Sequence, residues 1–219
     1  MKNHVSTYTA DLLKRKWLSD KSFEIALSAP PRFEFEPGQR ILLRLGEHER
    51  DYSIVSSPRE SDLTLCIRMV AGGKLSVLLS VADIGTSLSI NGPHGYFTYK
   101  PSRRPAVFVA TGTGIAPFCS MARSGITGFT LLHGVGLPDD LYYASLFQQN
   151  AKKYVPCLTE AKELPNFTFK GKVTEYIDQH LAPGAYDFYL CGRNEMIRDV
   201  TLLIDERFPE SLVYTEQFY

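Results

Sequence analysis

The most constraining feature of this sequence is a short apolar segment that runs directly into a glycine-rich turn. Residues 106–110 read Ala-Val-Phe-Val-Ala, and Thr111-Gly112-Thr113-Gly114-Ile115-Ala116-Pro117 follow without a gap. Such an unbroken apolar run indicates a buried parallel strand, and the turn predicts a helix that ends near Arg123. Glycines let backbone N–H groups approach a ligand, and a helix N-terminus favours anions. The stretch therefore favours an α/β domain whose first turn binds a diphosphate.

Beyond this turn, strand and helix patterns alternate, which predicts a doubly wound parallel sheet. Because ligands bind at the carboxyl ends of such strands, residues 111–117 and 191–194 should meet at one edge. The turn is not a strict Gly-x-Gly-x-x-Gly, since Pro117 holds the third position, and it lacks the Lys-Ser/Thr of a P-loop, which argues against nucleotide hydrolysis. The expected strands are 106–110, 129–135, 154–158, 186–191 and 212–218, and the later helices are 139–149, 174–181 and 195–208.

The N-terminal half has a different texture, with short alternating segments separated by proline and glycine turns. This pattern predicts an antiparallel barrel or sandwich. One short helix, Leu75–Val81, follows Gly72-Gly73-Lys74-Leu75-Ser76, where a diphosphate would fit; a plain glycine turn with Ser76 as N-cap explains it equally well. The texture changes at 101–105, so we expect two domains, 1–101 and 102–219. The expected strands are 8–14, 22–27, 40–45, 50–55, 63–69, 87–90 and 97–99.

Within one of these strands, Arg50-Asp51-Tyr52-Ser53 combines a cation, a phenol ring and a hydroxyl. On a regular strand Arg50 and Tyr52 share one face and Ser53 lies on the other. A guanidinium suits a phosphate, a phenol ring suits a flat heterocycle, and a nearby hydroxyl can bond a ring nitrogen. This chemistry suits a flavin nucleotide, although most strings of this kind are ordinary strand sequence.

Charge and cysteine content exclude several other classes of protein. The 24 Lys and Arg residues balance 24 Asp and Glu residues, which argues against a general nucleic-acid binder. No apolar run approaches a membrane span of about 20 residues, and the N-terminus lacks a signal-peptide core, so we expect a cytoplasmic protein without a membrane span. The four cysteines are far apart in sequence, which predicts neither a metal site nor a disulfide.

Taken together, these motifs resemble the ferredoxin–NADP reductase family, most of all the bacterial ferredoxin/flavodoxin reductases. The resemblance covers the whole chain, and its motifs occur in the family's order and spacing. They are Arg50-Asp51-Tyr52-Ser53, Gly73-Lys74-Leu75-Ser76, Thr111 to Pro117, Cys191-Gly192 with Met196 beyond it, and the ending Glu216-Gln217-Phe218-Tyr219. The resemblance implies a β-barrel FAD domain, then an α/β NAD(P) domain, and electron transfer between NADPH or NADH and a one-electron carrier protein.

The resemblance also implies roles for matching residues. Arg50, with Asp51 beside it, would neutralise an FAD phosphate, Tyr52 would lie against the flavin, and Ser53 would hydrogen-bond near its N5 atom. Gly73, Lys74, Leu75 and Ser76 would hold the FAD diphosphate, and Tyr219 would stack on the other flavin face. Ser53, Cys191, Glu216 and Tyr219 are the expected catalytic set. The nicotinamide nucleotide would contact Thr111, Gly112, Thr113, Gly114, Pro117, Cys191, Gly192, Arg193 and Met196. Thr113, which would lie where the two domains meet, would also contact the FAD.

Two departures from the family pattern concern the nucleotide's 2′-phosphate. Gly136 stands where relatives often carry Arg, and Thr159-Glu160 stands where they often read Ser-Arg; a third basic position survives as Lys172. A carboxylate repels a phosphate but accepts hydrogen bonds from a free ribose hydroxyl. We therefore predict weakened NADPH discrimination and use of NADH.

The partner implied by the resemblance is a separate ferredoxin or flavodoxin, and we expect the reductase itself to be a monomer. A basic face including Lys14-Arg15-Lys16 would steer an acidic carrier. Three alternatives stay open: the reductase component of an oxygenase or a flavin or ferric reductase, a non-catalytic flavin-binding subunit, and a two-domain protein without flavin.

Overall fold

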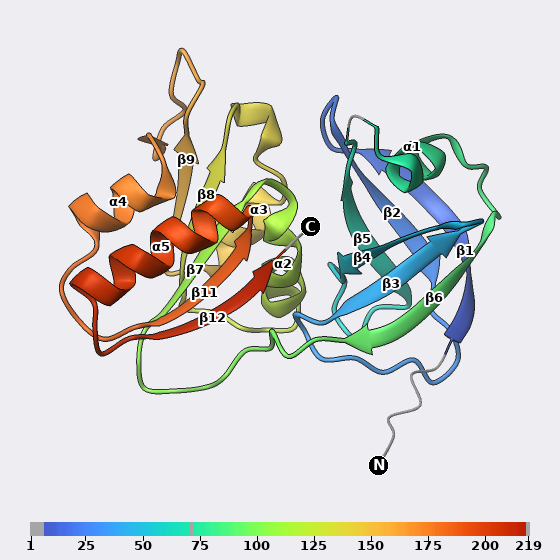
Figure 1. Cartoon of the computed structure of the whole chain (residues 1–219), viewed down its shortest axis with the longest axis horizontal. Helices are drawn as coiled ribbons and strands as arrows, with labels where there is room; N and C mark the ends of the chain where they lie inside the picture. The colour runs from blue at the N-terminus through green and yellow to red at the C-terminus, as the bar shows by residue number, and fades with distance from the viewer. Residues whose placement is uncertain (1–6, 71, 218–219) are drawn as a thin grey trace. The chain divides into compact units, whose positions relative to one another are not determined.

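Two six-stranded sheets organise the chain, one antiparallel and one parallel (Figure 1). The computed structural model describes residues 7–70 and 72–217. Contacts divide the chain into two compact units: the chain up to Tyr99 together with Ala116–Ser124, and Lys100–Ile115 together with the chain from Gly125 on. The predicted fold class, a β domain with an α/β domain, is confirmed.

The antiparallel sheet is a curled β-structure built from alternating apolar residues. In β3, for example, Ile41 and Leu43 are fully buried between more exposed neighbours. Beyond β4, Ile54 forms a bridge with Leu65, so the sheet curls until its two ends approach. The strands are β1 (Thr7–Trp17), β2 (Ser22–Ser28), β3 (Arg40–Leu45), β4 (His48–Ser53), β5 (Asp62–Arg68) and β6 (Ser87–His94), in the order β4-β3-β6-β1-β2-β5.

Two helices belong to this first unit. Helix α1 (Lys74–Val81) inserts Leu75 and Leu79 into the barrel core. Helix α2 (Ala116–Arg123) follows the glycine-rich turn in sequence, yet its contacts place it with the barrel. There the Ser120 hydroxyl donates to the carbonyl oxygen of Ser56 at 2.7 Å.

Two expected elements are wrong in detail. Residues 97–99 form no strand, because the Phe97 ring packs against Phe118 of α2, with ring centroids 5.7 Å apart, instead of joining the sheet. The expected helix 139–149 is broken: a 3₁₀ turn, η2 (Pro138–Asp140), precedes α3 (Ala144–Asn150). Tyr143 between them has a φ of 60°, which lies in the left-handed region and interrupts helical geometry.

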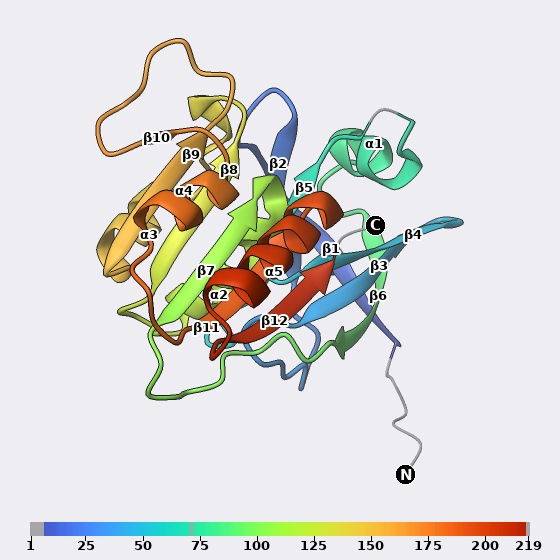
Figure 2. The ribbon, with the colours of Figure 1, turned by 60° about the vertical axis from the view of Figure 1, so that its left-hand side comes forward.

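The second unit is a parallel sheet flanked by helices. Its strands are β7 (Ala106–Thr111), β8 (Thr130–Val135), β9 (Lys153–Leu158), β10 (Phe169–Lys170), β11 (Asp187–Gly192) and β12 (Leu212–Gln217), in the order β10-β9-β8-β7-β11-β12. Helices α4 (Val173–His180) and α5 (Asn194–Arg207) cover one face (Figure 2). Val107 and Val109 of the central strand β7 pack there with Ile177 and Val200. The doubly wound sheet is therefore confirmed, with β10 as an addition that was not predicted.

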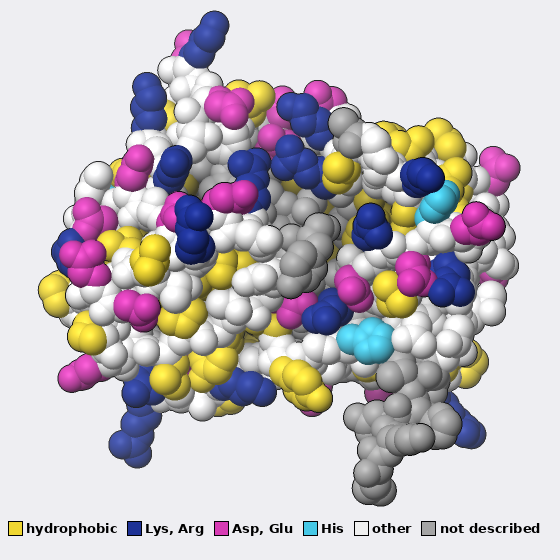
Figure 3. Space-filling model, in the orientation of Figure 1, with side chains coloured by type: hydrophobic (Ala, Val, Ile, Leu, Met, Phe, Trp, Pro, Cys, Tyr) yellow, Lys and Arg dark blue, Asp and Glu magenta, His cyan; other side chains and the backbone are white. Residues whose placement is uncertain are grey.

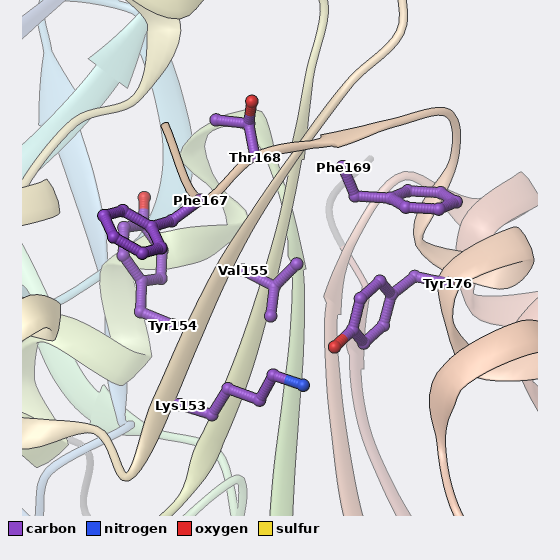
Figure 4. A pocket seen from close by; sticks show the side chains of 7 residues that line it. All are labelled: Lys153, Tyr154, Val155, Phe167, Thr168, Phe169 and Tyr176. Carbon is purple, nitrogen blue, oxygen red and sulfur yellow. The ribbon is translucent and has the colours of Figure 1, made fainter. Parts of the chain in front are cut away.

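At its β10 edge the parallel sheet leaves part of β9 uncovered, because β10 pairs only with Cys157 and Leu158. A cavity of about 280 Å³ opens beside this edge, with the Tyr154 and Phe167 rings on one side and Phe169 and Tyr176 on the other (Figure 4). Backbone groups alternate along a strand, and Leu158 faces β10, so Pro156 also faces the open edge. Proline has no N–H to offer there, which protects the edge from pairing with another strand.

Candidate active site

Strand β4 positions the first group of predicted site residues. Its register with β3 is regular from Leu45/His48 to Arg40/Ser53, so Arg50 and Tyr52 share one face as predicted. The guanidinium of Arg50 is exposed, whereas Tyr52 is half-buried against the barrel core. Burial raises the pKa of Tyr52 to about 12, against the opposing effect of Arg50, so the phenol stays neutral at physiological pH. The strand thus presents an uncharged aromatic ring beside an exposed cation, whose guanidinium donates to the Glu49 carbonyl oxygen at 3.1 Å.

Ser53 ends β4 and is almost completely buried, at 2 % exposure. Its hydroxyl has no hydrogen-bond partner among the residues that the structure describes. Buried hydroxyls without a partner are rare and cost free energy. The Ser53 hydroxyl is therefore available to a bound group with a polar ring atom, and a flavin meets that requirement.

Asp51, which lies between these residues, faces the other way. Its carboxylate forms an ion pair with Arg40, with the nitrogen and oxygen 3.4 Å apart. Both side chains are partly exposed, so the pair contributes little stability. Asp51 is therefore engaged with β3, and this contact offers no reason to place it against a cofactor.

The start of α1 presents the second predicted group. Gly73 is the N-cap residue, and no side chain caps the helix there. The first N–H groups of the helix, from Lys74 onward, therefore have no intrahelical partner and point outward as anion donors. The Ser76 hydroxyl is buried and lies 3.4 Å from the Gly73 carbonyl oxygen and 3.5 Å from the Val70 nitrogen. Backbone donors, more than this hydroxyl, are what the turn offers to a diphosphate.

In the second unit, the end of β7 and the end of β11 are neighbours, as predicted. The strand order reverses at this point, since β8 and β9 lie on one side of β7 and β11 and β12 on the other. The 3₁₀ turn η1 (Gly112–Ile115) leaves β7 here. In open parallel sheets the ligand binds outside the carboxyl ends at such a reversal.

Three contacts lock the turn onto the end of β11. The Arg193 N–H donates to the Thr111 hydroxyl at 3.0 Å. A Cβ atom on Gly114 would lie 2.3 Å from the Cys191 carbonyl oxygen, and one on Gly192 would lie 2.2 Å from the Thr111 hydroxyl oxygen. Neither glycine tolerates a side chain, because the two backbones touch. These glycines thus shape the turn by close packing within the protein.

Cys191 and Glu216 are paired in register on β11 and β12, and both are buried. Burial, with a smaller effect of the Glu216 carboxylate, raises the pKa of the Cys191 thiol well above its usual range. The thiol is therefore neutral and cannot act as a thiolate nucleophile. Its chemistry here is that of a small, polarisable contact surface.

Gly136, Thr159, Glu160 and Lys172 follow the carboxyl ends of β8, β9 and β10, so the sheet brings them to one edge. The Glu160 N–H donates to the Gly136 carbonyl oxygen at 2.9 Å. A Cβ on Gly136 would lie 3.1 Å from the Glu160 carboxylate, which places that carboxylate directly beside the glycine. Lys172 is exposed at the start of α4, where its backbone N–H donates to Glu175 at 2.9 Å.

The other predicted residues are more dispersed. Met196 is buried in the core beneath α4 and α5, and Pro117 is buried within α2 in the first unit. Thr113 is half-buried in η1. Tyr219 lies outside the described residues. No cluster of three or more potential metal-ligating side chains occurs within 7–70 and 72–217, where all four cysteines are buried and none forms a disulfide.

One site residue was missed at the sequence level. His133 is fully buried in β8, and its Nε2 atom lies 3.1 Å from the Gly112 carbonyl oxygen at the start of η1. Its only sequence signal is a polar imidazole inside the apolar strand 129–135, and such a residue is usually a satisfied core histidine.

Comparisons with known proteins agree with this geometry. The Oxidoreductase FAD-binding domain family matches residues 11–99, and the Oxidoreductase NAD-binding domain family matches residues 108–201. The Toluate 1,2-dioxygenase electron transfer component of Pseudomonas putida is 29% identical over 93% of this chain and 65% of its own length. The 2-halobenzoate 1,2-dioxygenase electron transfer component of Burkholderia cepacia is 31% identical over 97% of this chain and 68% of its own length. The chain thus spans about two thirds of the length of these curated relatives.

Solved structures share the fold over nearly the whole chain. A ferredoxin NADP+ reductase from Neisseria gonorrhoeae, with bound FAD and NADP, has a TM-score of 0.84 at 22% identity and covers 97% of this chain and 99% of its own. A ferredoxin reductase in carbazole 1,9a-dioxygenase has a TM-score of 0.86 at 20% identity, over 100% of this chain and 71% of its own. The two family matches and the 31% identical relative, together with this shared fold, show that the chain belongs to the ferredoxin–NADP reductase family of FAD- and NAD-binding oxidoreductases.

Proposed function

We propose that this protein is an FAD-dependent oxidoreductase that passes electrons between NADH or NADPH and a one-electron carrier protein, a ferredoxin or flavodoxin. The observation that carries the proposal is the buried, unpartnered Ser53 hydroxyl at the end of β4, in a segment that matches the FAD-binding family. We divide the chain into an FAD-binding domain, 1–101, and an NAD(P)-binding domain, 102–219. The two family matches, 11–99 and 108–201, support this division.

The residues of the first unit bind and orient the cofactor. When FAD is bound, it supplies a ring that accepts a hydride and releases electrons one at a time. Arg50 neutralises a phosphate, the neutral Tyr52 ring lies against the heterocycle, and Ser53 donates a hydrogen bond to a ring nitrogen. The N–H groups that open α1 hold the diphosphate. Tyr219, which we assign to the opposite flavin face, lies outside the described residues.

The residues of the second unit bind the nicotinamide nucleotide. Thr111 to Gly114 receive its phosphates, while the neutral Cys191 thiol and Glu216 line the nicotinamide pocket. Because burial keeps the Cys191 thiol neutral, it offers the nicotinamide a small polarisable contact surface. What the chain contributes is positioning and exclusion of water.

Glu160 favours NADH as the electron donor. Its carboxylate lies beside Gly136 at the strand ends, where an added phosphate would meet a negative charge instead of a guanidinium. A free ribose hydroxyl would instead find a hydrogen-bond acceptor. Lys172, exposed at the same edge, keeps some affinity for NADPH.

An anaerobic absorption experiment tests the proposed function. The purified chain should be yellow and should retain FAD, and NADH should bleach its flavin absorption within the mixing time of a stopped-flow instrument. A yellow protein that neither nucleotide bleaches would instead be a flavin-binding subunit. A colourless protein unable to take up FAD would overturn the proposal altogether.

A second candidate, the reductase component of an oxygenase, is favoured by the names of the relatives. These include electron transfer components of dioxygenases and the reductase component of Propane 2-monooxygenase from Mycolicibacterium smegmatis. Rates of reduction of a ferredoxin, a flavodoxin, free flavin, ferric chelate and an isolated oxygenase component would separate the candidates. No helix within the described ranges has the length and apolar character needed to cross a membrane. A cytoplasmic location and a monomeric state stay predictions.

A further inference from the structure

His133 makes a specific hydrogen bond to the turn that follows β7. The imidazole lies inside the sheet, and its Nε2 atom is 3.1 Å from the Gly112 carbonyl oxygen. A carbonyl oxygen can only accept, so the geometry assigns the proton to Nε2. His133 therefore donates to the first peptide of η1.

The other ring nitrogen has a partner that fits this assignment. Nδ1 is left as an acceptor, and the Tyr154 hydroxyl lies 3.5 Å away, at the long limit of a hydrogen bond. Tyr154 and His133 lie on the same face of the sheet, because Tyr154 pairs with Leu131, two residues before His133. Burial lowers the pKa of His133 to about 4, so the neutral tautomer persists at physiological pH.

This contact complements those on the other side of the turn. Strand β11 fixes η1 through Thr111, Gly114 and Gly192, whereas His133 reaches it from β8. Gly112 opens η1 with a φ of 53°, which lies in the left-handed region that favours glycine. The histidine bond gives the carbonyl of this residue a side-chain donor from β8.

We propose that His133 is a positioning residue for the nucleotide turn: its Nε2–H fixes the Gly112 peptide and thereby orients the N–H groups of Thr113 and Gly114 toward the nucleotide phosphates. This inference rests on the proposed function only in taking η1 as the nucleotide turn. His133 itself touches the turn and not the reacting atoms.

The test compares His133→Phe, which fills the space without a donor, with His133→Gln, whose amide can still donate. His180→Gln in α4 is the matched control. Binding of NAD+ and NADP+ to each full-length, FAD-loaded variant is measured by calorimetry, and KM and kcat for NADH by ferricyanide reduction. We expect His133→Phe to raise Kd and KM about tenfold, the effect of one hydrogen bond, with kcat and FAD retention within about twofold. His133→Gln should recover Kd to within about threefold, and His180→Gln should match wild type.

Two results would overturn the inference: an unchanged Kd in His133→Phe, or a joint loss of FAD, kcat and nucleotide affinity that His133→Gln fails to restore. If the phenylalanine ring is not accommodated, His133→Leu carries the same expectation. A wild-type protein that binds nucleotide without flavin reduction would refute the proposed function, while the Kd ratio would still decide the role of His133. A wild type that binds neither nucleotide would refute both.

Discussion

At the scale of single residues, two buried serines of the first unit differ in whether their hydroxyl group is hydrogen-bonded. Ser120 donates to the Ser56 carbonyl oxygen at 2.7 Å, whereas the Ser53 hydroxyl has no partner among the described residues. Removal of a satisfied buried hydroxyl costs about 1 kcal/mol, and removal of an unsatisfied one costs nothing. The pair therefore contrasts a hydroxyl that serves the fold with one that we propose serves the flavin.

We predict that Ser53→Ala slows flavin reduction by NADH about 10- to 100-fold, because it removes one donor to the developing charge. Affinity for FAD should change less than threefold, since we assign the phosphate contacts to Arg50 and α1. Without FAD, Ser53→Ala should be as stable as wild type, while Ser120→Ala should lose about 1 kcal/mol in urea unfolding. An apo Ser53→Ala protein that is destabilised as much as Ser120→Ala would show that the hydroxyl serves the fold.

We propose that the nucleotide preference depends on Glu160. Glu160→Gln keeps the shape of the side chain and removes its charge, so the ratio of kcat/KM for NADPH over that for NADH should rise about tenfold, the effect of one nearby unit charge at the protein surface. Steady-state rates with the two nucleotides measure this ratio. Glu163→Gln, in the exposed loop that follows, removes the same charge as a control. Equal ratios in both variants would mean that Glu160 does not face the ribose.

At the scale of elements, helix α1 depends on a residue of the distant strand β1. The Arg15 guanidinium donates to the carbonyl oxygens of Leu79 at 3.1 Å and Ala82 at 2.7 Å, which end the helix. A cation at this end satisfies carbonyls that lack intrahelical partners and complements the helix dipole. Arg15 therefore holds the helix whose other end we assign to the FAD diphosphate.

We predict that Arg15→Met lowers the free energy of unfolding by about 1–2 kcal/mol and weakens FAD binding, because two charged hydrogen bonds are lost. Lys14→Met, its exposed neighbour, is the control and should change neither quantity. Chemical denaturation and a fluorescence titration with FAD provide the measurements. Indistinguishable variants would mean that α1 does not need this cap.

Strand β8 carries a second element-scale prediction, because His133 titrates inside it. Its pKa falls from about 6.5 in the unfolded chain to about 4 in the fold, chiefly through burial, while the Gly112 carbonyl and Asp140 oppose the shift. The folded state thus binds fewer protons, so its stability is full above pH 6.5 and declines as pH falls toward 4. Between pH 7.5 and pH 5, the free energy of unfolding should fall by about 2 kcal/mol more in wild type than in His133→Gln. Urea unfolding at both pH values tests this; parallel losses in wild type and variant would contradict it.

Sequence patterns predicted the elements that are long enough to show a regular pattern of apolar residues. The alternating residues of 40–45 and the apolar run 106–110 both became strands. A two-residue strand such as β10 has no period, and Phe97 looked like a strand residue although its ring packs on a helix. In the site, residue types predicted the β4 face and the meeting of β7 with β11. Two features of the site depend on interatomic distances that the spacing of residues in the sequence does not reveal. These are the Ser53 hydroxyl without a partner among the described residues, and the close approach of the Gly114 and Cys191 backbones.

At the scale of the whole molecule, the charge is balanced, with 24 basic and 24 acidic side chains. On the face drawn in Figure 3, Lys and Arg side chains alternate with Asp and Glu without a dominant sign. Because its net charge is zero, the protein as a whole does not attract an acidic carrier over long distances. Electrostatic steering must therefore come from a local cluster of basic side chains. The run Lys14-Arg15-Lys16 is such a cluster, but Arg15 is occupied at the end of α1. Only Lys14 and Lys16 of this run keep exposed ammonium groups.

If these two lysines steer the carrier, the double variant Lys14→Gln/Lys16→Gln should lower kcat/KM for an acidic ferredoxin or flavodoxin about fivefold at low salt. The difference should fade at about 0.5 M salt, where screening acts within a few ångströms, and reduction of ferricyanide should be unchanged. Lys152→Gln/Lys162→Gln removes the same charge from the second unit and is the control. Equal losses of kcat/KM in both double variants would show that net charge causes the effect. A rate of carrier reduction that does not depend on salt would show that electrostatic attraction does not steer the carrier to this reductase.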